Sequence, residues 1–228
     1  MEEQTPLDSA YLNAVLNANG IRPDEYQRRQ LERFVELLAE WNARLNLVSR
    51  KDFPAIRRNH VLHSLAALTF MSFDEGCRIV DMGTGGGFPG LPLAILSPKS
   101  TFVLCDSIAK KIRAVEDIAS RLRLENVECK LGRVETLASE PSMKRSVDFV
   151  LARAVSELPV LAHWGFPFLA KTGRRTLLAW KGGELMDELN STRKLPFVSS
   201  LECREINLVN EEFFTREKKY IVEVLFHG

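Results

Sequence analysis

The sequence lacks several features that mark other classes of protein. Its 228 residues contain no apolar run near the roughly 20 residues that a membrane-spanning helix needs. There is no internal repeat and no low-complexity tract. The acidic start, Met1–Gln4, has neither the basic nor the apolar segment of a secretory signal peptide. We therefore expect a globular, cytoplasmic protein that does not associate with membranes.

Cysteine is scarce, and its spacing argues against metal sites and disulfides. The four cysteines form neither a CxxC motif nor a cluster with histidine. Three of them lie in apolar, strand-like runs, where a free thiol behaves as a small buried hydrophobe. We expect reduced thiols and no bound metal. The cysteines are Cys77, Cys105, Cys129 and Cys203.

Neither sign of charge is in excess, because the formal net charge is +1, but the charges are unevenly distributed. Residues 1–40 carry eight acids and four bases. Clustered positive charge further along the chain can bind the phosphates of a nucleic acid, although a solvated surface is the more common explanation of any single cluster. The basic groups are Arg44, Arg50, Lys51, Arg57 and Arg58; Lys110, Lys111 and Arg113; and Lys171, Arg174, Arg175 and Lys181.

Residues 1–75 are predicted to form a helical extension that packs on the rest of the chain. Apolar residues recur at helical spacing between Asp24 and Leu45, and Pro23 is typical of a helix start. A second amphipathic stretch runs from Asp52 to Met71. We expect this extension and the remaining residues to form one compact domain.

From Gly76 onward, short β-branched runs alternate with helical stretches, which is typical of βαβ units and a parallel sheet. Leu201–Val209 and Tyr220–Phe226 have no helical stretch between them and fit an antiparallel pair at one edge. Residues 76–228 are therefore predicted to form a Rossmann-like α/β core with a seven-stranded, mostly parallel sheet whose last strand is antiparallel. The other expected strands are 78–82, 101–105, 127–131, 147–152 and 176–180, with helical stretches at 91–96, 109–122 and 158–169.

A glycine-rich segment, Asp81–Gly90, follows the first predicted strand. Glycines at alternate positions let the backbone turn tightly and approach a ligand closely. Phe88 stands where a dinucleotide-binding fingerprint has its third glycine. The pattern Asp81-Gly83-Gly85-Gly87 matches instead the D-x-G-x-G-x-G form used for S-adenosylmethionine. The segment predicts a site for that cofactor, and a purely structural turn is the alternative.

Two further segments follow the ends of the next strands. Asp106 lies 19 residues beyond Gly87 (106 − 87), where a carboxylate can accept hydrogen bonds from ribose hydroxyls. A helix cap is the alternative reading of Asp106. Val134 and Glu135 come just after the third strand and can meet an adenine edge, although this stretch alone would be taken for a surface turn.

Several segments along nearly the whole chain together form a recognisable pattern: Trp41–Ser49, His60–Leu65, Gly83–Pro92, Asp106-Ser107 with Lys110-Lys111, Leu124–Val127, Arg153-Ala154 and Lys181-Gly182. With these segments the chain resembles the small-subunit ribosomal RNA guanine-N7 methyltransferases once called glucose-inhibited division protein B. The Gly-Phe-Pro-Gly-Leu-Pro extension of the loop and the asparagine-leucine helix end are specific to that family among Rossmann-like methyltransferases.

The resemblance implies S-adenosylmethionine-dependent methylation of guanine N7 in 16S ribosomal RNA, either free or in the small ribosomal subunit. His63 departs from the family, which usually has aspartate there; we interpret it as a surface or helix-packing change. His60 is likewise interpreted as a helix-face residue. The cofactor-contacting positions implied by the resemblance are Gly83, Phe88, Val134, Glu135 and Arg153, with Asp106 at the ribose. The glycine pattern adds Gly85 to the predicted cofactor site.

Guanine N7 carries a lone pair and no proton, so we assign no catalytic acid or base. The basic groups at 50–58, 110–113 and 171–175 are expected to hold the RNA, with Arg50, Arg57, Arg58 and Lys181 as candidate contacts. Arg153 and Lys181 can bind phosphate or guanine O6, or can be surface charges. A methyltransferase for a small molecule or protein and a non-enzymatic nucleotide-binding module remain alternatives. We expect a monomer.

Overall fold

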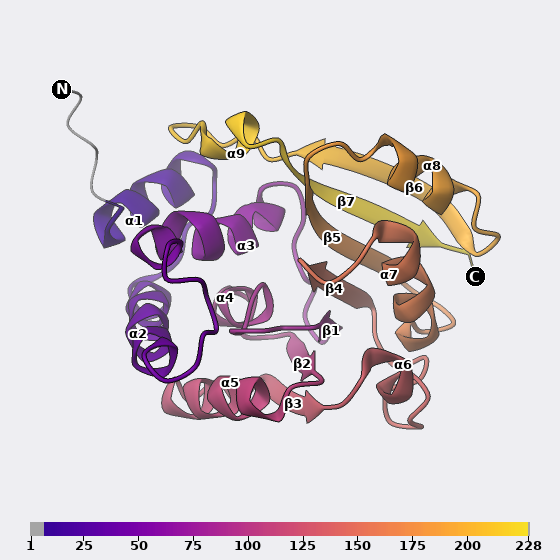
Figure 1. Cartoon of the computed structure of the whole chain (residues 1–228), viewed down its shortest axis with the longest axis horizontal. Coiled ribbons are helices and arrows are strands. Elements are labelled where there is room, and N and C mark those ends of the chain that lie inside the picture. The colour runs from indigo at the N-terminus through magenta and orange to yellow at the C-terminus, as the bar shows by residue number, and fades with distance from the viewer. Residues whose placement is uncertain (1–6, 228) are drawn as a thin grey trace.

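The computed structural model describes residues 7–227; the acidic start, residues 1–6, and residue 228 lie outside the described part. Its core is a seven-stranded sheet in the order β3-β2-β1-β4-β5-β7-β6 (Figure 1). Strands β1 to β5 pair in parallel, whereas β7 runs antiparallel to both neighbours. The predicted fold class is confirmed. The strands are β1 (Arg78–Met82), β2 (Thr101–Asp106), β3 (Val127–Leu131), β4 (Phe149–Arg153), β5 (Thr176–Gly182), β6 (Val198–Glu205) and β7 (Lys219–Phe226).

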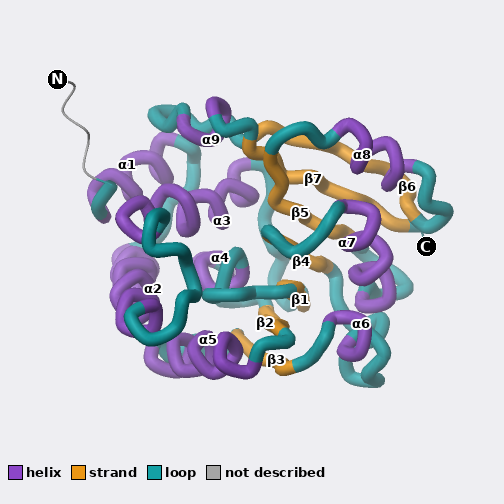
Figure 2. Tube along the Cα trace, in the orientation of Figure 1, coloured by secondary structure: helices purple, strands orange, loops and turns teal. Residues whose placement is uncertain are grey.

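Helices cover both faces of the sheet (Figure 2). Side chains alternate between the faces of a strand, so Ile79 packs with the N-terminal helices while Val80 packs on the other side. On the first side lie α1 (Ser9–Ala18), α2 (Glu25–Asn42), α3 (His63–Leu65), α4 (Gly90–Leu96) and α5 (Ala109–Arg121). On the second lie α6 (Val134–Leu137), α7 (Leu158–Gly165) and α8 (Met186–Arg193).

The N-terminal helices share one apolar core with the sheet. Helix α2 begins with a capping box, in which the Asp24 carboxylate accepts from the Gln27 amide at 2.8 Å and the Gln27 side chain accepts from the Asp24 amide. Its buried face includes Phe34, whose ring is fully excluded from solvent. At its end the Trp41 indole donates to Asp117 on α5 at 2.7 Å. The helical extension therefore packs directly on the sheet and its helices.

The stretch from Asp52 to Met71 is not the single amphipathic α-helix that its periodicity suggests. Short 3₁₀ turns at Phe53–Ala55 and Ala66–Thr69 flank a π-helical segment, Arg57–Leu62, and the short helix α3. A π-helix widens the turn and is frequent at functional sites. The widened turn changes which side chains of this stretch face the sheet.

Two differences from the prediction lie near the C-terminus. Strand β6 begins three residues before the predicted Leu201 and ends at Glu205, so residues 206–209 leave the sheet. A one-turn helix, α9 (Phe213–Arg216), interrupts the connection to β7. Four residues are too few to show helical periodicity, and α8 also escapes prediction because Leu189 is its one buried large apolar residue. The predicted antiparallel pair itself is confirmed.

Candidate functional site

The strand order reverses at β1, which lies between β2 and β4. In open parallel sheets, ligands bind beyond the carboxyl ends of the strands at such a point. The segments that follow β1, β2 and β4 are the glycine-rich loop, Asp106 with the start of α5, and Arg153–Ser156. The topology therefore brings together three segments that the sequence analysis singled out separately.

The loop after β1 has the backbone conformation that its glycines predict. Gly83, Gly85 and Gly87 have φ angles of +69°, +58° and +92°, a region that other residues rarely adopt. A Cβ atom on Gly83 would lie 2.8 Å from Cγ2 of Val155, in the segment after β4. The loop and the segment after β4 therefore lie so close together that position 83 has no room for a side chain.

Asp81, at β1, holds this loop in place through a hydrogen bond. Its side chain is fully buried and accepts a hydrogen bond from the Gly90 amide at 3.0 Å. Burial raises the pKa of Asp81 to about 7, against the opposing effect of the Gly90 amide. Gly90 leaves no space for a side chain, because a Cβ there would lie 2.2 Å from Cδ2 of Leu104. The first acid of the motif therefore holds the loop rather than facing a ligand.

Asp106 lies at the end of β2 with 6% of its surface exposed. Its Oδ2 accepts from the Gly85 amide at 3.1 Å, and its Oδ1 accepts from the Ile108 amide at 2.9 Å. The Lys111 ammonium is 3.9 Å from Oδ2. The alternative reading as a helix cap was wrong, because α5 has Ile108 at its N-terminal cap and no side-chain cap hydrogen bond. The carboxylate closes a local turn before the helix and ties the glycine-rich loop to β2.

The other predicted cofactor positions have different surroundings. Phe88 is buried against Phe34, with ring centroids 5.3 Å apart in an edge-on arrangement. Val134 is buried at the start of α6, and the neighbouring Glu135 is exposed. Arg153 lies above Phe88, its guanidinium carbon 5.2 Å from the ring centroid. The assignment of these residues to the cofactor remains a prediction.

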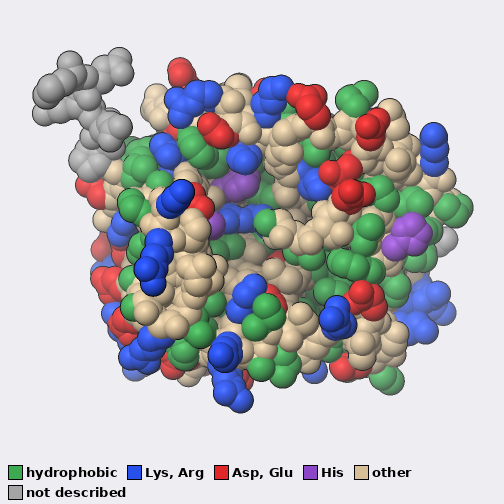
Figure 3. Space-filling view, in the orientation of Figure 1, with side chains coloured by type: hydrophobic (Ala, Val, Ile, Leu, Met, Phe, Trp, Pro, Cys, Tyr) green, Lys and Arg blue, Asp and Glu red, His purple; other side chains and the backbone are tan. Residues whose placement is uncertain are grey.

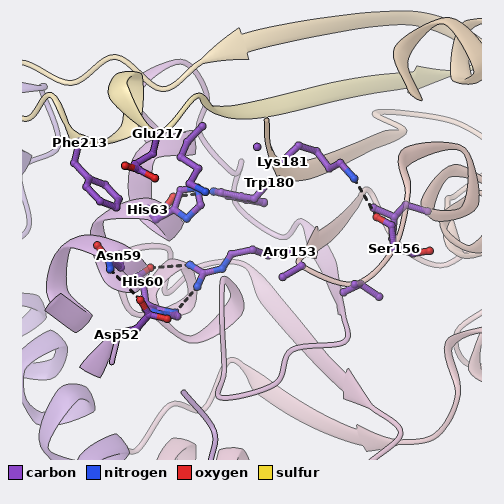
Figure 4. Close-up of a pocket in the computed structure, with 15 residues that line it drawn as sticks. Asp52, Asn59, His60, His63, Arg153, Ser156, Trp180, Lys181, Phe213 and Glu217 are labelled. Atoms are coloured by element: carbon purple, nitrogen blue, oxygen red, sulfur yellow. Dashed lines mark hydrogen bonds between the residues drawn. The ribbon is translucent and has the colours of Figure 1, made fainter. Parts of the chain in front are cut away.

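A cavity of about 630 Å³ opens beside the loop (Figure 4). Arg153 donates to the His60 carbonyl at 3.2 Å and also to Nδ1 of the same residue. Because a guanidinium only donates, the Nε2 atom of His60 carries the ring hydrogen. His60 lies in the helical segment Arg57–Leu62, and it also lines the cavity and holds Arg153, which the helix-face interpretation did not anticipate. Figure 3 shows histidine and basic side chains recessed in the middle of this face.

Burial shifts the pKa values of two groups that line the cavity. Burial, and then the Arg153 guanidinium, lower the pKa of His60 to about 3. Burial lowers the pKa of Arg153 to about 10, although Asp81 and Asp52 oppose the shift. Near neutral pH, Arg153 is therefore charged and His60 is neutral.

His63 is buried rather than a surface residue, with 9% of its surface exposed. Its ring stacks on Phe214 at 5.3 Å between centroids, and its carbonyl accepts from the Trp180 indole at 2.7 Å. Burial, with Arg153 as the next contribution, holds its pKa well below the usual value. The helix-packing interpretation fits these contacts, but His63 also lines the cavity.

The four candidate RNA contacts differ in whether another side chain of the protein already contacts the cation. Arg50 is exposed. Arg57 forms an ion pair with Glu32 at 2.6 Å, and the Arg58 guanidinium carbon lies 4.0 Å from the Phe213 ring centroid. Lys181 pairs with Glu188 at 2.7 Å and is not the surface charge of the alternative reading.

The third basic group of the sequence is split by strand β5. Arg175 precedes the strand, whereas Lys181 lies near its carboxyl end. A seven-residue strand spans about 23 Å at roughly 3.3 Å per residue. Lys171, Arg174 and Arg175 therefore lie at the amino edge of the sheet, away from the site. Their contribution to RNA binding remains a prediction.

Nine lining residues of the cavity were named by the sequence analysis neither as site residues nor within a family motif: Asp52, Asn59, Val155, Ser156, Leu161, Trp180, Phe213, Glu217 and Lys219. The last three come from α9 and the start of β7, far along the chain from the glycine-rich loop. The Phe213-Phe214 pair between two strand-like runs was the one available sign that this connection packs on the core.

Several family motifs have structural roles. The Asn42 side chain accepts from the Val48 amide at 2.9 Å, which closes the turn after α2. The Asn126 amide group donates to three carbonyls, those of Ala94, Ser97 and Ser100, at 3.1, 3.2 and 3.0 Å. Asn126 directly precedes β3, and Ser100 directly precedes β2, so its contacts lie at the amino edge of the sheet, away from the site.

Residues 7–227 include no helix long and apolar enough to cross a membrane. Within the same residues no group of three or more His, Cys, Asp and Glu side chains is placed to hold a metal ion. All four cysteines are free thiols, of which Cys105 is buried and the other three are partly exposed.

Residues 27–219 match the family model described as rRNA small subunit methyltransferase G. The chain is 38% identical over 206 residues to the ribosomal RNA small subunit methyltransferase G of Christiangramia forsetii, an alignment covering 89% of this chain and 92% of that protein. The protein of the same name from Chlorobium luteolum is 37% identical over 216 residues, covering 92% of this chain and 87% of that protein.

Solved structures show the same fold at low sequence identity. A putative O-methyltransferase from Klebsiella pneumoniae has a TM-score of 0.59 at 13% identity, covering 96% of this chain and 97% of that one. A SAM-dependent O-methyltransferase from Thermotoga maritima has a TM-score of 0.57 at 15% identity, covering 76% of this chain and 69% of that one. With a fold shared by methyltransferases and a family match over most of its length, the chain belongs to the rRNA small subunit methyltransferase G family.

Proposed function

We propose that the protein methylates N7 of a guanine in 16S ribosomal RNA, with S-adenosylmethionine as the methyl donor, and that it acts as a cytoplasmic monomer. The observation that carries the proposal is the cavity beside the glycine-rich loop, in a chain that belongs to an rRNA methyltransferase family. The cavity contains a fixed cation, Arg153, at the edge of the sheet where ligands bind.

The residues of the loop fit the cofactor. Gly83 and Gly85 turn the backbone at positive φ, and position 83 has no room for a side chain because a Cβ there would lie 2.8 Å from Cγ2 of Val155. Asp106 would receive the ribose, Val134 and Glu135 would border the adenine, and Gly83 would meet the amino-acid end. When bound, S-adenosylmethionine supplies a methyl group attached to a positively charged sulfur. These assignments rest on the positions of the residues around the carboxyl ends of β1, β2 and β3.

The chemistry that the cavity supports is positioning rather than proton transfer. Guanine N7 has an in-plane lone pair and no proton, so methylation there needs no general base. His60, whose pKa is about 3, neither gains nor loses a proton near neutral pH. Arg153 uses Nη1 and Nη2 on His60 and retains other N–H groups that can donate to guanine O6. Holding the reacting atoms in place is then the main source of rate acceleration.

The RNA would reach the cavity across exposed cations. Arg50 and Lys110 are exposed, and Lys110 lies in the first turn of α5, directly after β2. Both therefore lie on the loop side of the sheet, where they can contact phosphates on either side of the target nucleotide. A base inside the cavity must be unstacked, so we expect the target in a loop or a partly unfolded region.

The test is transfer of labelled methyl groups from S-adenosylmethionine to small-subunit particles and to free 16S RNA that lack the modification. The expected result is label at N7 of one guanine, and its loss in Gly83→Asp, whose side chain would disturb the loop against Val155. If the protein binds the cofactor but labels no ribosomal RNA, the RNA assignment is wrong, and a small molecule or protein becomes the candidate substrate. Such a substrate would be modified at a rate nearly independent of salt.

A further inference from the structure

The segment after β4 has a backbone conformation that its residue types do not favour. Ala154 has a φ angle of +56°, in the left-handed region that residues with a side chain seldom adopt. The next residue, Val155, lies against the glycine-rich loop, since a Cβ on Gly83 would meet its Cγ2 at 2.8 Å. All four residues from Arg153 to Ser156 line the cavity. An unfavourable conformation of this kind persists only where neighbouring groups hold it in place.

Two charged side chains hold this segment. Lys181, near the carboxyl end of β5, donates to the Ser156 carbonyl at 3.1 Å, a bond drawn in Figure 4. Glu188, in α8, accepts from the Leu158 amide at 2.6 Å through its Oε2 atom. The same oxygen lies 2.7 Å from the Lys181 ammonium. The segment is therefore held at two backbone positions by an ion pair that joins β5 to α8.

The ion pair is sheltered from solvent. The Lys181 side chain is 13% exposed and that of Glu188 is 23% exposed. Removing one partner from a sheltered pair is costly, because it leaves the other charge without compensation. Lys181 lines the cavity, whereas Glu188 is not among the lining residues and acts on the cavity only through Lys181 and the start of α7.

The glycine-rich loop has supports that do not involve this ion pair. The Gly90 amide donates to Asp81, and the Gly85 amide donates to Asp106. Without Glu188 the loop should therefore keep its shape, while the wall of the cavity formed by the segment after β4 shifts. A displacement of about 1 Å between reacting groups can cost about a hundredfold in rate. The ion pair should thus affect the rate of methyl transfer more than the affinity for the cofactor.

We propose that Glu188 is a positioning residue for methyl transfer. Through Lys181 and the Leu158 amide, it keeps Arg153–Ser156 in the conformation that places the target base beside the cofactor. The inference rests on the proposed function and adds α8 to the parts of the fold that the reaction needs. It also gives Lys181 a role within the protein in place of an RNA contact.

The experiment replaces Glu188 by alanine and measures methyl transfer and cofactor binding separately. Calorimetric titration with S-adenosylhomocysteine gives the affinity and the number of folded sites, and kcat at saturating RNA is expressed per site. For Glu188→Ala, kcat per site should fall at least about tenfold, because a hydrogen bond to a charged group is lost, while Kd should change less than about threefold. A variant that was merely destabilised would have fewer sites and an unchanged kcat per site.

The matched control is Asp187→Ala, on the same helix. Asp187 is exposed and forms no ion pair within residues 7–227. This variant should keep the native kcat and Kd. An equal loss of kcat in the two variants would show that the Glu188 contacts are not responsible, and the inference is then overturned.

A second substitution tests the strained backbone. Glycine adopts a φ of +56° more readily than alanine by about tenfold, so Ala154→Gly should make the segment less dependent on the ion pair. Adding Ala154→Gly to Glu188→Ala should raise kcat per site at least about threefold above that of Glu188→Ala alone. If it gives no recovery, the ion pair does not maintain the strained conformation and the inference is wrong.

Hydrogen exchange adds a readout that needs no turnover. The Leu158 amide should exchange at least about tenfold faster in Glu188→Ala than in the native protein, and at the native rate in Asp187→Ala. Unchanged exchange in Glu188→Ala contradicts the inference directly. If the native protein labels no ribosomal RNA, the proposed function fails, and the exchange rates still show separately whether Glu188 orders the segment.

Discussion

Substituting alanine for Gly83 tests the close approach of the glycine-rich loop to the segment after β4. Two costs arise at this position. The φ angle of +69° is unfavourable for alanine by about 1–2 kcal/mol. The new Cβ would also lie 2.8 Å from Cγ2 of Val155, and crowding of that kind costs a further ~1–3 kcal/mol. We expect Gly83→Ala to lower the free energy of unfolding by about 2–5 kcal/mol.

Gly85→Ala provides a matched control, because Gly85 has a φ of +58° but no atom nearer than 3.9 Å to its virtual Cβ. This variant should lose about 1–2 kcal/mol, from the backbone alone. Urea unfolding at constant pH measures both variants, and each kcal/mol should shift Tm by about 2–4 °C in a chain of this length. The difference between the two variants measures the crowding against Val155.

The double variant Gly83→Ala with Val155→Ala completes a mutant cycle. Removing the Val155 methyl groups should restore about 1 kcal/mol or more, measured as a coupling energy between the two positions. If Gly83→Ala costs no more than Gly85→Ala, and the coupling energy is below about 0.5 kcal/mol, the close approach does not limit residue 83 and the reasoning is refuted.

Three further predictions concern charged groups. The unfolded state protonates His60 near pH 6.5 and the folded state only near pH 3, so stability falls as the pH drops below 6.5. The contribution of His60 to this loss between pH 7 and 5 is about 2 kcal/mol. Because the depressed pKa of His63 adds a loss of its own, urea unfolding of His60→Asn, which keeps an acceptor for Arg153, should show a pH dependence smaller than the native one by about 2 kcal/mol. Arg50→Gln should reduce by about one the slope of the logarithm of the RNA-binding constant against the logarithm of the salt concentration. Arg57→Gln should leave that slope unchanged and lower the free energy of unfolding by roughly 1 kcal/mol, because Arg57 is paired with Glu32. If Arg57→Gln changes the slope and Arg50→Gln does not, the Arg57–Glu32 pair opens to bind RNA. Lys110→Gln should weaken RNA binding in filter-binding assays, because Lys110 lies at the carboxyl edge of the sheet. Arg174→Gln should leave binding unchanged, because Arg174 lies at the amino edge. Equal effects of the two variants would show that the RNA contacts both edges.

The sequence by itself determined the fold class and the location of the cofactor loop. Alternation of strand-like and helical periods reveals a parallel sheet, because each period reflects which side chains face a core. Positive φ angles at Gly83, Gly85 and Gly87 follow from the spacing of the glycines, since few other residues adopt them. These features are local, so local sequence encodes them.

The tertiary structure alone decided which charged side chains are available. Arg57 and Lys181 looked like free cations, but Glu32 and Glu188 engage them through contacts that no motif indicates. Strand β5 separates Arg175 from Lys181, although six residues part them in sequence (181 − 175). Such pairings depend on which surfaces meet after the chain has folded.

The cavity likewise combines a residue from a recognisable motif with residues that are distant in the sequence. His60 belongs to a motif visible in the sequence, but the π-helical turn and the contact with Arg153 decide that it enters the cavity. Glu217 lies more than 130 residues beyond the glycine-rich loop (217 − 83 = 134), on a connection whose single helical turn is too short to have a period. It reaches the site because β7 inserts between β5 and β6 and returns the chain to the carboxyl edge of the sheet. Strand order is a property of the whole sheet, and local periodicity does not specify it.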